Sequence, residues 1–112
     1  MAEAELLERL AREGLAAQAW GNGPFDVYGA HRHGYDKVLV AAAGSITFHL
    51  PELEQDVLLE AGDRLELPAQ TLHAADVGPH GVTCLEAHRP AGSLEPVPKH
   101  VPAWREQGTG RG

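Results

Sequence analysis

His31 and His33 are the residues whose spacing most directly suggests chemistry, because a single residue separates the two imidazoles. On a β-strand, alternate side chains share a face, so both rings would point the same way, about 7 Å apart along the backbone. On a helix the same pair would diverge. Two rings on one face of a strand can tilt toward one ion, since neutral imidazole is a common metal ligand. An H-x-H pair alone is a weak motif, because most histidines are not ligands.

A third histidine on another inward-facing strand would complete such a set. His73 is the candidate, because it follows a turn marked by Pro68. Three neutral imidazoles would leave coordination positions open for water or substrate. They suit Fe(II), Zn, Ni or Cu better than Mg or Ca.

The elements that must position these residues follow from the apolar pattern and the turn residues. Residues 3–13 are predicted to form a helix, whose leucine stripe could pack on the same chain or on a partner subunit. Later residues alternate between short apolar runs and turns, which predicts strands at 27–33, 37–43, 45–50, 56–59, 64–67, 71–77 and 82–88. Such a sheet must close or stack to bury one face, so an all-β sandwich or barrel is predicted. One helical turn is predicted near Trp104 in the Pro-rich tail.

Composition limits the classes of function. The 112 residues suffice for one domain, and the formal net charge of −7 repels nucleic acid and anionic lipid. We therefore expect no nucleic-acid partner and no membrane association. The lone Cys84 allows no intramolecular disulfide, residues 1–5 lack the features of a signal peptide, and no apolar run reaches the length of a membrane span. The expected location is the cytoplasm.

Two segments resemble the two motifs of the cupin superfamily, in the family's order. Residues 31–44 resemble the first motif, which is H-x-H, three or four residues, Glu, six residues and Gly. Residues 62–73 resemble the second, which is Gly, five residues, Pro-x-Gly, two residues and His. The resemblance covers about residues 25–88.

This resemblance implies a double-stranded β-helix, the jelly-roll barrel of cupins. The barrel would occupy residues 25–90, with the helix and lead-in at 1–24 and a tail at 91–112. The resemblance also implies that a divalent transition metal (Fe, Zn, Ni, Cu or Mn) is bound by three ligands, namely His31, His33 and His73. Cupin barrels commonly pair, so a homodimer is expected.

Lys37 occupies the position of the family's Glu ligand. An ammonium about 4 Å from a dication would be repelled by roughly 8 kcal/mol at an effective dielectric near 20. Lys37 therefore cannot replace a carboxylate ligand. Several alternatives stay open: Lys37 turns away, pairs with a carboxylate such as Glu86 or Asp36, is held neutral as a base or nucleophile, or lines a pocket without metal. Gln70 stands where the family usually has Gly, so the turn before His73 must tolerate a side chain.

The strand predicted at 82–88 supplies further candidates. Cys84, Glu86 and His88 alternate and so share one face. If that face points inward, Glu86 could neutralise Lys37 and His88 could become a fourth ligand. A solvent-facing polar side is equally compatible with the alternation. Cys84 itself is expected to be a small core residue.

The other histidines and the large aromatics are assigned no chemistry. His49 is expected on the outer face of its strand as exposed filler, and the turn and tail histidines are His80 and His100. Some aromatic residues could line a pocket mouth, although core packing is their more common role; they are Trp20, Phe25 and Tyr28.

These residues support functions of different classes. The first is a metal-dependent enzyme, of dioxygenase or isomerase type, that acts on a small organic molecule and uses Lys37 or Glu86 to handle protons. The second is a non-catalytic module that binds a small molecule or a metal. The third is a metal-free pocket that uses Lys37, and the fourth is a structural dimer whose site has decayed. One fold hosts many activities, so the motifs do not choose among these.

Overall fold

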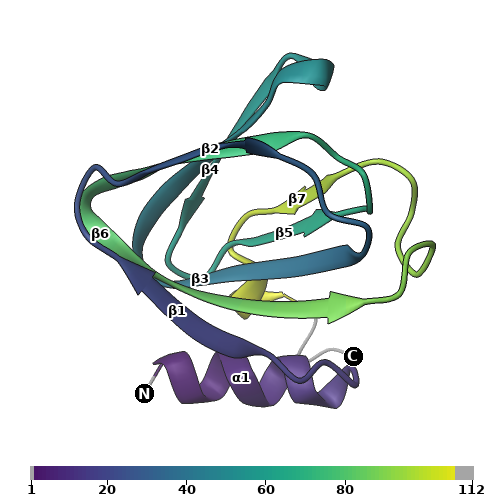
Figure 1. The fold of residues 1–112 in the computed structure, drawn as a ribbon. Coiled ribbons are helices and arrows are strands. Elements are labelled where there is room, and N and C mark those ends of the chain that lie inside the picture. The colour runs from purple at the N-terminus through teal and green to yellow at the C-terminus, as the bar shows by residue number, and fades with distance from the viewer. Residues whose placement is uncertain (1, 108–112) are drawn as a thin grey trace.

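A computed structural model describes residues 2–107 of the chain (Figure 1). Seven strands form one antiparallel sheet that curls into a barrel, and a helix lies against its outside. In chain order the elements are α1 (Ala2–Arg12), β1 (Gln18–Asn22), β2 (Val27–His31), β3 (Asp36–Leu50), the 3-10 turn η1 (Pro51–Leu53), β4 (Gln55–Glu60), β5 (Arg64–Leu67), β6 (His73–Arg89), β7 (Lys99–Val101) and the 3-10 turn η2 (Trp104–Glu106). No helix among these residues is long and apolar enough to cross a membrane.

The two long strands, β3 and β6, pair with each other along most of their length and bend together (Figure 1). The first half of β3 also pairs with β5 and its second half with β4, while β6 pairs with β2 near its start and with β1 near its end. Each long strand therefore contributes to both walls of the barrel. At the bend, Gly44 has φ of 72°, and a Cβ there would lie 2.0 Å from the carbonyl oxygen of Gly81. The bend requires glycine at position 44.

The predicted all-β barrel with an N-terminal helix is confirmed, but several strand limits are wrong. Strand β3 joins the strands predicted at 37–43 and 45–50, and β6 joins those predicted at 71–77 and 82–88. The glycines between the predicted pieces bend the paired strands instead of ending them. Strand β2 ends at His31, two residues before its predicted end. Strands β1 and β7, which were not predicted, pair with β6 and β5.

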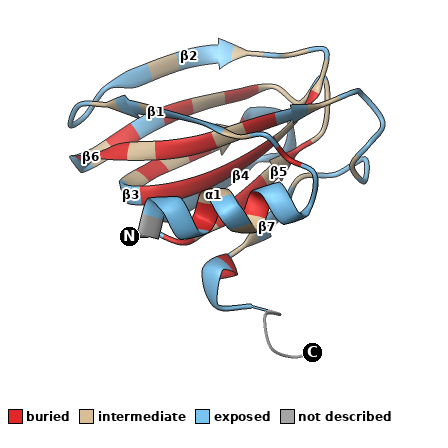
Figure 2. Ribbon diagram, turned by 90° about the horizontal axis from the view of Figure 1, so that it is seen from below, coloured by how far each residue is buried: buried red, intermediate tan, exposed pale blue. Residues whose placement is uncertain are grey.

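Apolar side chains form one cluster inside the barrel and another between the barrel and α1. Alternation along β3 directs Leu39 inward, while Val38 and Val40 meet Leu6 and Leu10 of α1. The buried side of α1 accordingly faces the sheet (Figure 2). The leucine stripe therefore packs on its own barrel.

Trp104 fastens the C-terminal segment to the same outer cluster, in the helical turn that was predicted there. Two guanidinium groups lie over its ring, with the Cζ of Arg9 4.4 Å and that of Arg64 4.9 Å from the ring centre. Arg64 is itself buried and pairs with the carboxylates of Glu13 and Glu66. Helix, barrel and tail thus meet on the side of the sheet that faces away from the barrel interior.

Candidate metal centre

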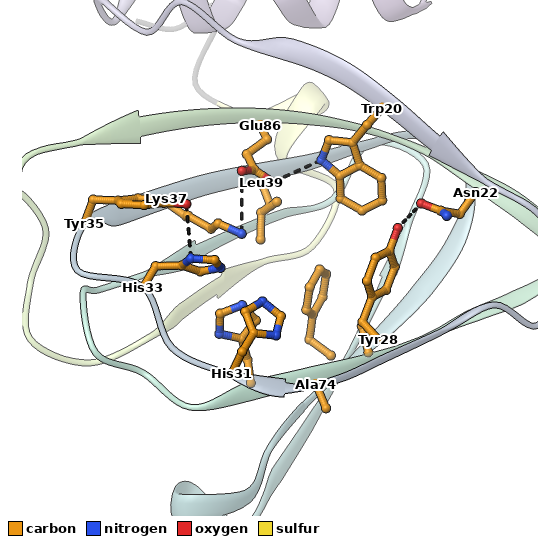
Figure 3. Close-up of a pocket in the computed structure, with 13 residues that line it drawn as sticks. Trp20, Asn22, Tyr28, His31, His33, Tyr35, Lys37, Leu39, Ala74 and Glu86 are labelled. Atoms are coloured by element: carbon orange, nitrogen blue, oxygen red, sulfur yellow. Dashed lines mark hydrogen bonds and ion pairs between the residues drawn. The ribbon is translucent and has the colours of Figure 1, made fainter.

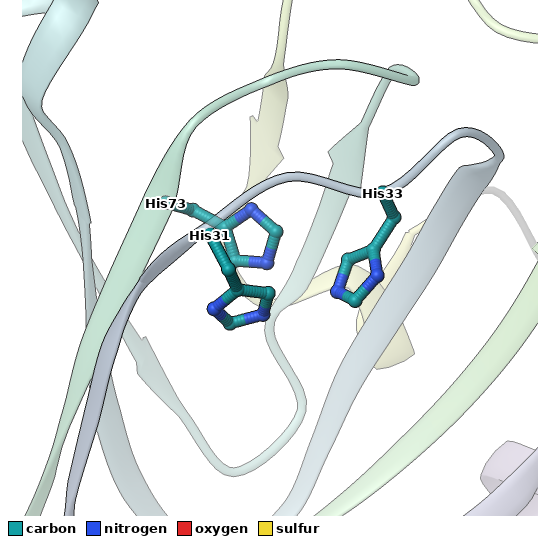
Figure 4. A group of neighbouring side chains, drawn as sticks. All are labelled: His31, His33 and His73. Carbon is teal, nitrogen blue, oxygen red and sulfur yellow. The ribbon is translucent and has the colours of Figure 1, made fainter.

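Three histidines converge inside the barrel, and they are the three that the sequence singled out (Figure 4). His31 ends β2 and is the register partner of His73, which begins β6. His33 lies in the loop after β2, not on the predicted strand, yet its ring is 4.7 Å from that of His31 and 5.3 Å from that of His73. One nitrogen from each ring lies within 4.8 Å of the other two. These residues could hold one metal ion.

Hydrogen bonds decide which nitrogen of each ring is free. Nδ1 of His31 lies 2.7 Å from the carbonyl oxygen of Gly29, and Nδ1 of His73 lies 2.9 Å from that of Thr71. A carbonyl can only accept, so each Nδ1 carries the proton and each Nε2 presents a lone pair. This is the orientation by which proteins prepare imidazole for a metal.

His33 gives a separate indication of a missing partner. Its Nε2 is buried and has no hydrogen-bond partner among the described residues, while its Nδ1 lies 3.1 Å from the hydroxyl of Tyr35. A buried polar atom without a partner is costly, and a metal ion is one of the partners that satisfies it. The donor set therefore fits a divalent transition metal.

Burial also keeps two of the rings, those of His33 and His73, neutral, as metal ligands must be. Desolvation lowers the pKa of His73 to about 4, against a smaller opposing effect of its hydrogen bond to Thr71. The pKa of His33 is likewise lowered, first by desolvation and then by the positive charge of Lys37. Both rings are thus unprotonated at neutral pH.

Lys37 pairs with Glu86, which is one of the alternatives left open by the sequence. Its Nζ lies 3.5 Å from Oε2 of Glu86, and the two side chains are only 11% and 17% exposed. The other carboxylate considered, Asp36, is buried elsewhere and accepts the backbone N–H groups of Ala69 and Leu94, each at 2.7 Å. The lysine points into the pocket, toward the histidines (Figure 3).

Glu86 is a hub of polar contacts on the inner face of β6. Its Oε1 accepts the indole N–H of Trp20 at 3.0 Å, and its Oε2 lies 2.5 Å from Nε2 of His88. Burial alone would raise the pKa of Glu86, but the contacts with His88, Lys37 and Trp20 together hold it below its usual value. Glu86 is therefore an anion at neutral pH.

The three alternating residues of β6, namely Cys84, Glu86 and His88, lie in different surroundings. Glu86 lines the pocket and the buried Cys84 belongs to the inner core, so the polar face points inward. His88 is not in the metal group of His31, His33 and His73, and its half-exposed side chain lines a second hollow instead. Burial raises the pKa of Cys84 to about 12, which is consistent with a core residue.

Aromatic and aliphatic side chains form the rest of the pocket, which has a volume of about 330 Å³ (Figure 3). Trp20 and Tyr28 meet edge to face, with centroids 5.8 Å apart, and the hydroxyl of Tyr28 donates to Oδ1 of Asn22. Leu39 and Phe48 complete this apolar wall. Trp20 and Glu86 also line the second hollow, together with Ala16, Gln18, Ala19 and His88.

Sequence reasoning missed Tyr35 and mistook His49. Tyr35 stacks on His33 and on His88, and the alternation of His31, His33 and Tyr35 is the signal that could have found it. His49 does lie on the outside, but it is not filler: its two ring nitrogens lie 2.7 Å from Asp56 and 2.8 Å from Asp76.

Other sequence candidates also have a defined place. Trp20 and Tyr28 line the pocket, whereas Phe25 is 70% exposed and does not line it. Gln70 adopts φ of 69° in the turn before His73, so this turn does hold a side chain where the cupin motif has glycine.

Comparison with known proteins supports the same fold. No model of a known protein family matches the chain. Acireductone dioxygenase of Pseudomonas fluorescens (strain Pf0-1) is 39% identical over 66 residues, which are 55% of this chain and 36% of that protein. The enzyme of the same name from Pseudomonas syringae pv. syringae (strain B728a) gives the same figures. The chain thus spans about a third of the length of these relatives.

Solved structures extend the likeness to between 66% and 76% of the chain. A structure of the DMSP lyases RdDddP and RnDddQII matches with a TM-score of 0.63 and 28% identity, over 76% of this chain and 43% of that one. A cupin-2 domain protein from Shewanella frigidimarina gives 0.56 and 16%, over 66% and 68%. Bacillus subtilis oxalate decarboxylase, a protein with Mn(II) centres, gives 0.58 and 19%, over 72% and 22%.

Barrel topology, the two motifs and these likenesses together define the class of fold: the chain is a small barrel of the cupin type. Within that class, its pocket combines three histidines with a lysine–glutamate ion pair.

Proposed function

We propose that this cupin binds a divalent transition metal through His31, His33 and His73 and acts on a small organic molecule, with oxygenase- or isomerase-type chemistry. The observation that carries the proposal is the convergence of three ring nitrogens within 4.8 Å of one another, at the base of a pocket of about 330 Å³. Two of these rings have Nδ1 fixed by a carbonyl, which leaves Nε2 free to coordinate.

When bound, a divalent transition metal supplies Lewis-acid polarisation of a carbonyl group or activation of O₂. We assign the catalytic roles on the protein to Lys37 and Glu86. The ammonium of Lys37 can donate a hydrogen bond or a proton to a substrate oxygen, and the carboxylate of Glu86, 3.5 Å away, can stabilise the ammonium or take up a proton. The apolar wall of Trp20, Tyr28 and Phe48 would orient the substrate and exclude water.

The relatives support this direction of chemistry. Acireductone dioxygenases are named for an oxygenase reaction, and the 28% identical structure is named for DMSP lyases. Since the chain covers only 36% of the dioxygenases, their substrate is not transferred to it. What they share with this chain is a stretch of 66 residues.

A second candidate is a pocket that works without metal and uses Lys37. The observation in its favour is the lysine at the position of the family's carboxylate ligand, paired with Glu86 inside the pocket. In that case Lys37 would hold an anionic group of the ligand or act as a nucleophile.

Elemental analysis separates these candidates. The protein is purified without chelator and without affinity-tag metal, beside His31→Ala, His33→Ala and His73→Ala. We expect near one ion per chain in the wild type and loss of the ion in each of these variants. His49→Ala is the matched control, because this histidine lies outside the pocket, and it should keep the metal. A wild type that takes up neither Fe, Zn, Ni, Cu nor Mn would overturn the metal-dependent function and favour the second candidate.

We also propose that the protein works as a homodimer in the cytoplasm. The outer face of β2, β3, β4 and β6 lies opposite the face that α1 covers, and it carries the exposed side chains of Val27 and Leu58. Exposed apolar side chains on one sheet face support pairing of two barrels. Light scattering during size-exclusion chromatography should give twice the chain mass, and a monomer at micromolar concentration would contradict the dimer.

A further inference from the structure

The charge balance of the pocket differs from that of a site with a carboxylate ligand. Among the described residues that line the pocket, Glu86 is the only acid. Its two oxygens already contact the indole N–H of Trp20, the ring of His88 and the ammonium of Lys37. The protein therefore presents three imidazoles to a metal and no uncommitted carboxylate.

Lys37 and Glu86 neutralise each other, so the pair offsets none of the charge of a dication. The three rings are uncharged when they coordinate. A divalent metal in this pocket would keep its full double charge, beside an ammonium that lies on the same side of the barrel (Figure 3). Such a site attracts an anion more strongly than a site that has its own carboxylate.

The apolar wall of the pocket has a different chemistry. Trp20 and Tyr28 meet edge to face with centroids 5.8 Å apart, and Phe48 and Leu39 lie beside them. Its polar groups already have partners, since the hydroxyl of Tyr28 donates to Asn22 and the indole N–H of Trp20 donates to Glu86. This wall suits a flat apolar group, and the volume of about 330 Å³ limits the ligand to a small one.

We infer that the pocket takes a small carboxylate with a flat apolar body. The anionic oxygens of this ligand would occupy the coordination position of the family's Glu ligand, whose place in this chain is taken by Lys37. The carboxylate would contact the metal and Lys37, and the apolar body would lie on Trp20, Tyr28 and Phe48. This inference rests on the proposed metal binding. Under this inference, binding of the anion and binding of the metal are coupled: each raises the affinity of the protein for the other by the same factor.

Co²⁺ and two matched organic probes test the coupling. Visible absorption reports Co²⁺ binding to the wild type alone, with benzoate, and with benzamide, which has the same shape without the charge. We expect benzoate to lower the dissociation constant of Co²⁺ by about tenfold or more, and benzamide to change it by less than about twofold. Calorimetry should show the reciprocal gain, in which benzoate binds more tightly to the protein loaded with Co²⁺.

The two lysines of the chain, Lys37 and Lys99, provide matched variants. Lys37→Glu places a carboxylate at the position where the cupin motif has one, so Co²⁺ should bind tightly without benzoate and the benzoate effect should fall below about twofold. Lys99→Glu makes the same charge change at the exposed, only other lysine of the chain and should keep the effect. Circular dichroism checks that Lys37→Glu is folded; if it is not, the comparison of benzoate with benzamide on the wild type decides alone.

The outcomes separate the two proposals. Co²⁺ binding that benzoate leaves unchanged, or that benzamide strengthens equally, overturns the anionic ligand and leaves the metal site standing. No Co²⁺ binding in any condition overturns the proposed metal site and the anionic ligand with it. A benzoate effect that persists in Lys37→Glu overturns the assignment of the vacant ligand position to residue 37.

Discussion

Lys37 and Glu86 form an ion pair across two neighbouring strands, with Nζ and Oε2 separated by 3.5 Å. In the register of β3 and β6, Lys37 lies opposite His88 and Leu39 lies opposite Glu86, so the pair is a diagonal one on the inner face. It places the lysine side chain inside a barrel that has three histidines nearby. The stability of the empty barrel should therefore depend on Glu86.

Glu86→Gln should destabilise the protein, because it leaves the mostly buried ammonium of Lys37 without a counter-charge. We expect a loss of about 2 kcal/mol in the free energy of unfolding at pH 7, measured by urea denaturation. The pKa of Glu86 is lowered in the folded state, so this stabilisation is present above its unfolded pKa and disappears as the pH falls through the folded pKa. Glu95→Gln, at an exposed position, is the control, and an equal loss in both variants would contradict the role of the pair.

The metal-free protein should become less stable as the pH falls from 6.5 to about 4. The reason is that His73 stays neutral in the folded protein, whereas the same histidine gains a proton in the unfolded chain. The shift in pKa of His73 corresponds to about 3 kcal/mol across this window. Nuclear magnetic resonance of the imidazole should find His73 unprotonated at pH 5.5. The variant His73→Gln should show a smaller loss over the same window, and a protonated ring at pH 5.5 would contradict the desolvation argument.

On the outer face of the barrel, His49 should respond to pH in the opposite direction. Hydrogen bonds with Asp56 and Asp76 raise the pKa of His49, so its stabilisation is complete below its unfolded pKa and is lost as the pH rises through the folded value. We expect wild type to exceed His49→Gln by about 0.5 kcal/mol at pH 5.5, a small figure because the pair is partly screened by solvent. Thermal melting at pH 5.5 and pH 9 measures the difference, which should nearly vanish at the higher pH.

Trp104→Ala should destabilise the protein by about 3 kcal/mol, since a buried indole and its contacts with Arg9 and Arg64 are removed together. Because Trp104 packs in the outer cluster under α1, metal uptake by the folded variant should stay at the wild-type level. Leu53→Ala, at a side chain that is 44% exposed, should cost less than about 0.5 kcal/mol. Loss of metal uptake in folded Trp104→Ala would show that the outer cluster controls the pocket.

The sequence carried enough to place the fold and the three histidines, because local spacing encodes them. The H-x-H pair and the second motif fix His31, His33 and His73 without knowledge of the sheet. Strand β1 could not be recognised, since its residues 18–22 include glycine and asparagine and no β-branched side chain. Only its pairing with β6 makes it a strand.

Contacts that depend on register are those that the sequence left open. Whether Lys37 meets Glu86 or Asp36 is decided by the alignment of β3 with β6 and by the backbone N–H groups that satisfy Asp36. The partners of His49 lie 7 and 27 residues further along the chain, and they meet it only because β4 and β6 flank β3. Cross-strand register is a property of the whole sheet and is not written in any one motif.

The hydrogen bond between Trp20 and Glu86 has a consequence for solvent access. These two side chains line both the main pocket and the second hollow beside His88, so together they are a shared partition. Removal of the indole would take away part of the wall that the two hollows share. Water or a small gas would then reach the histidines from the second hollow as well as through the main pocket.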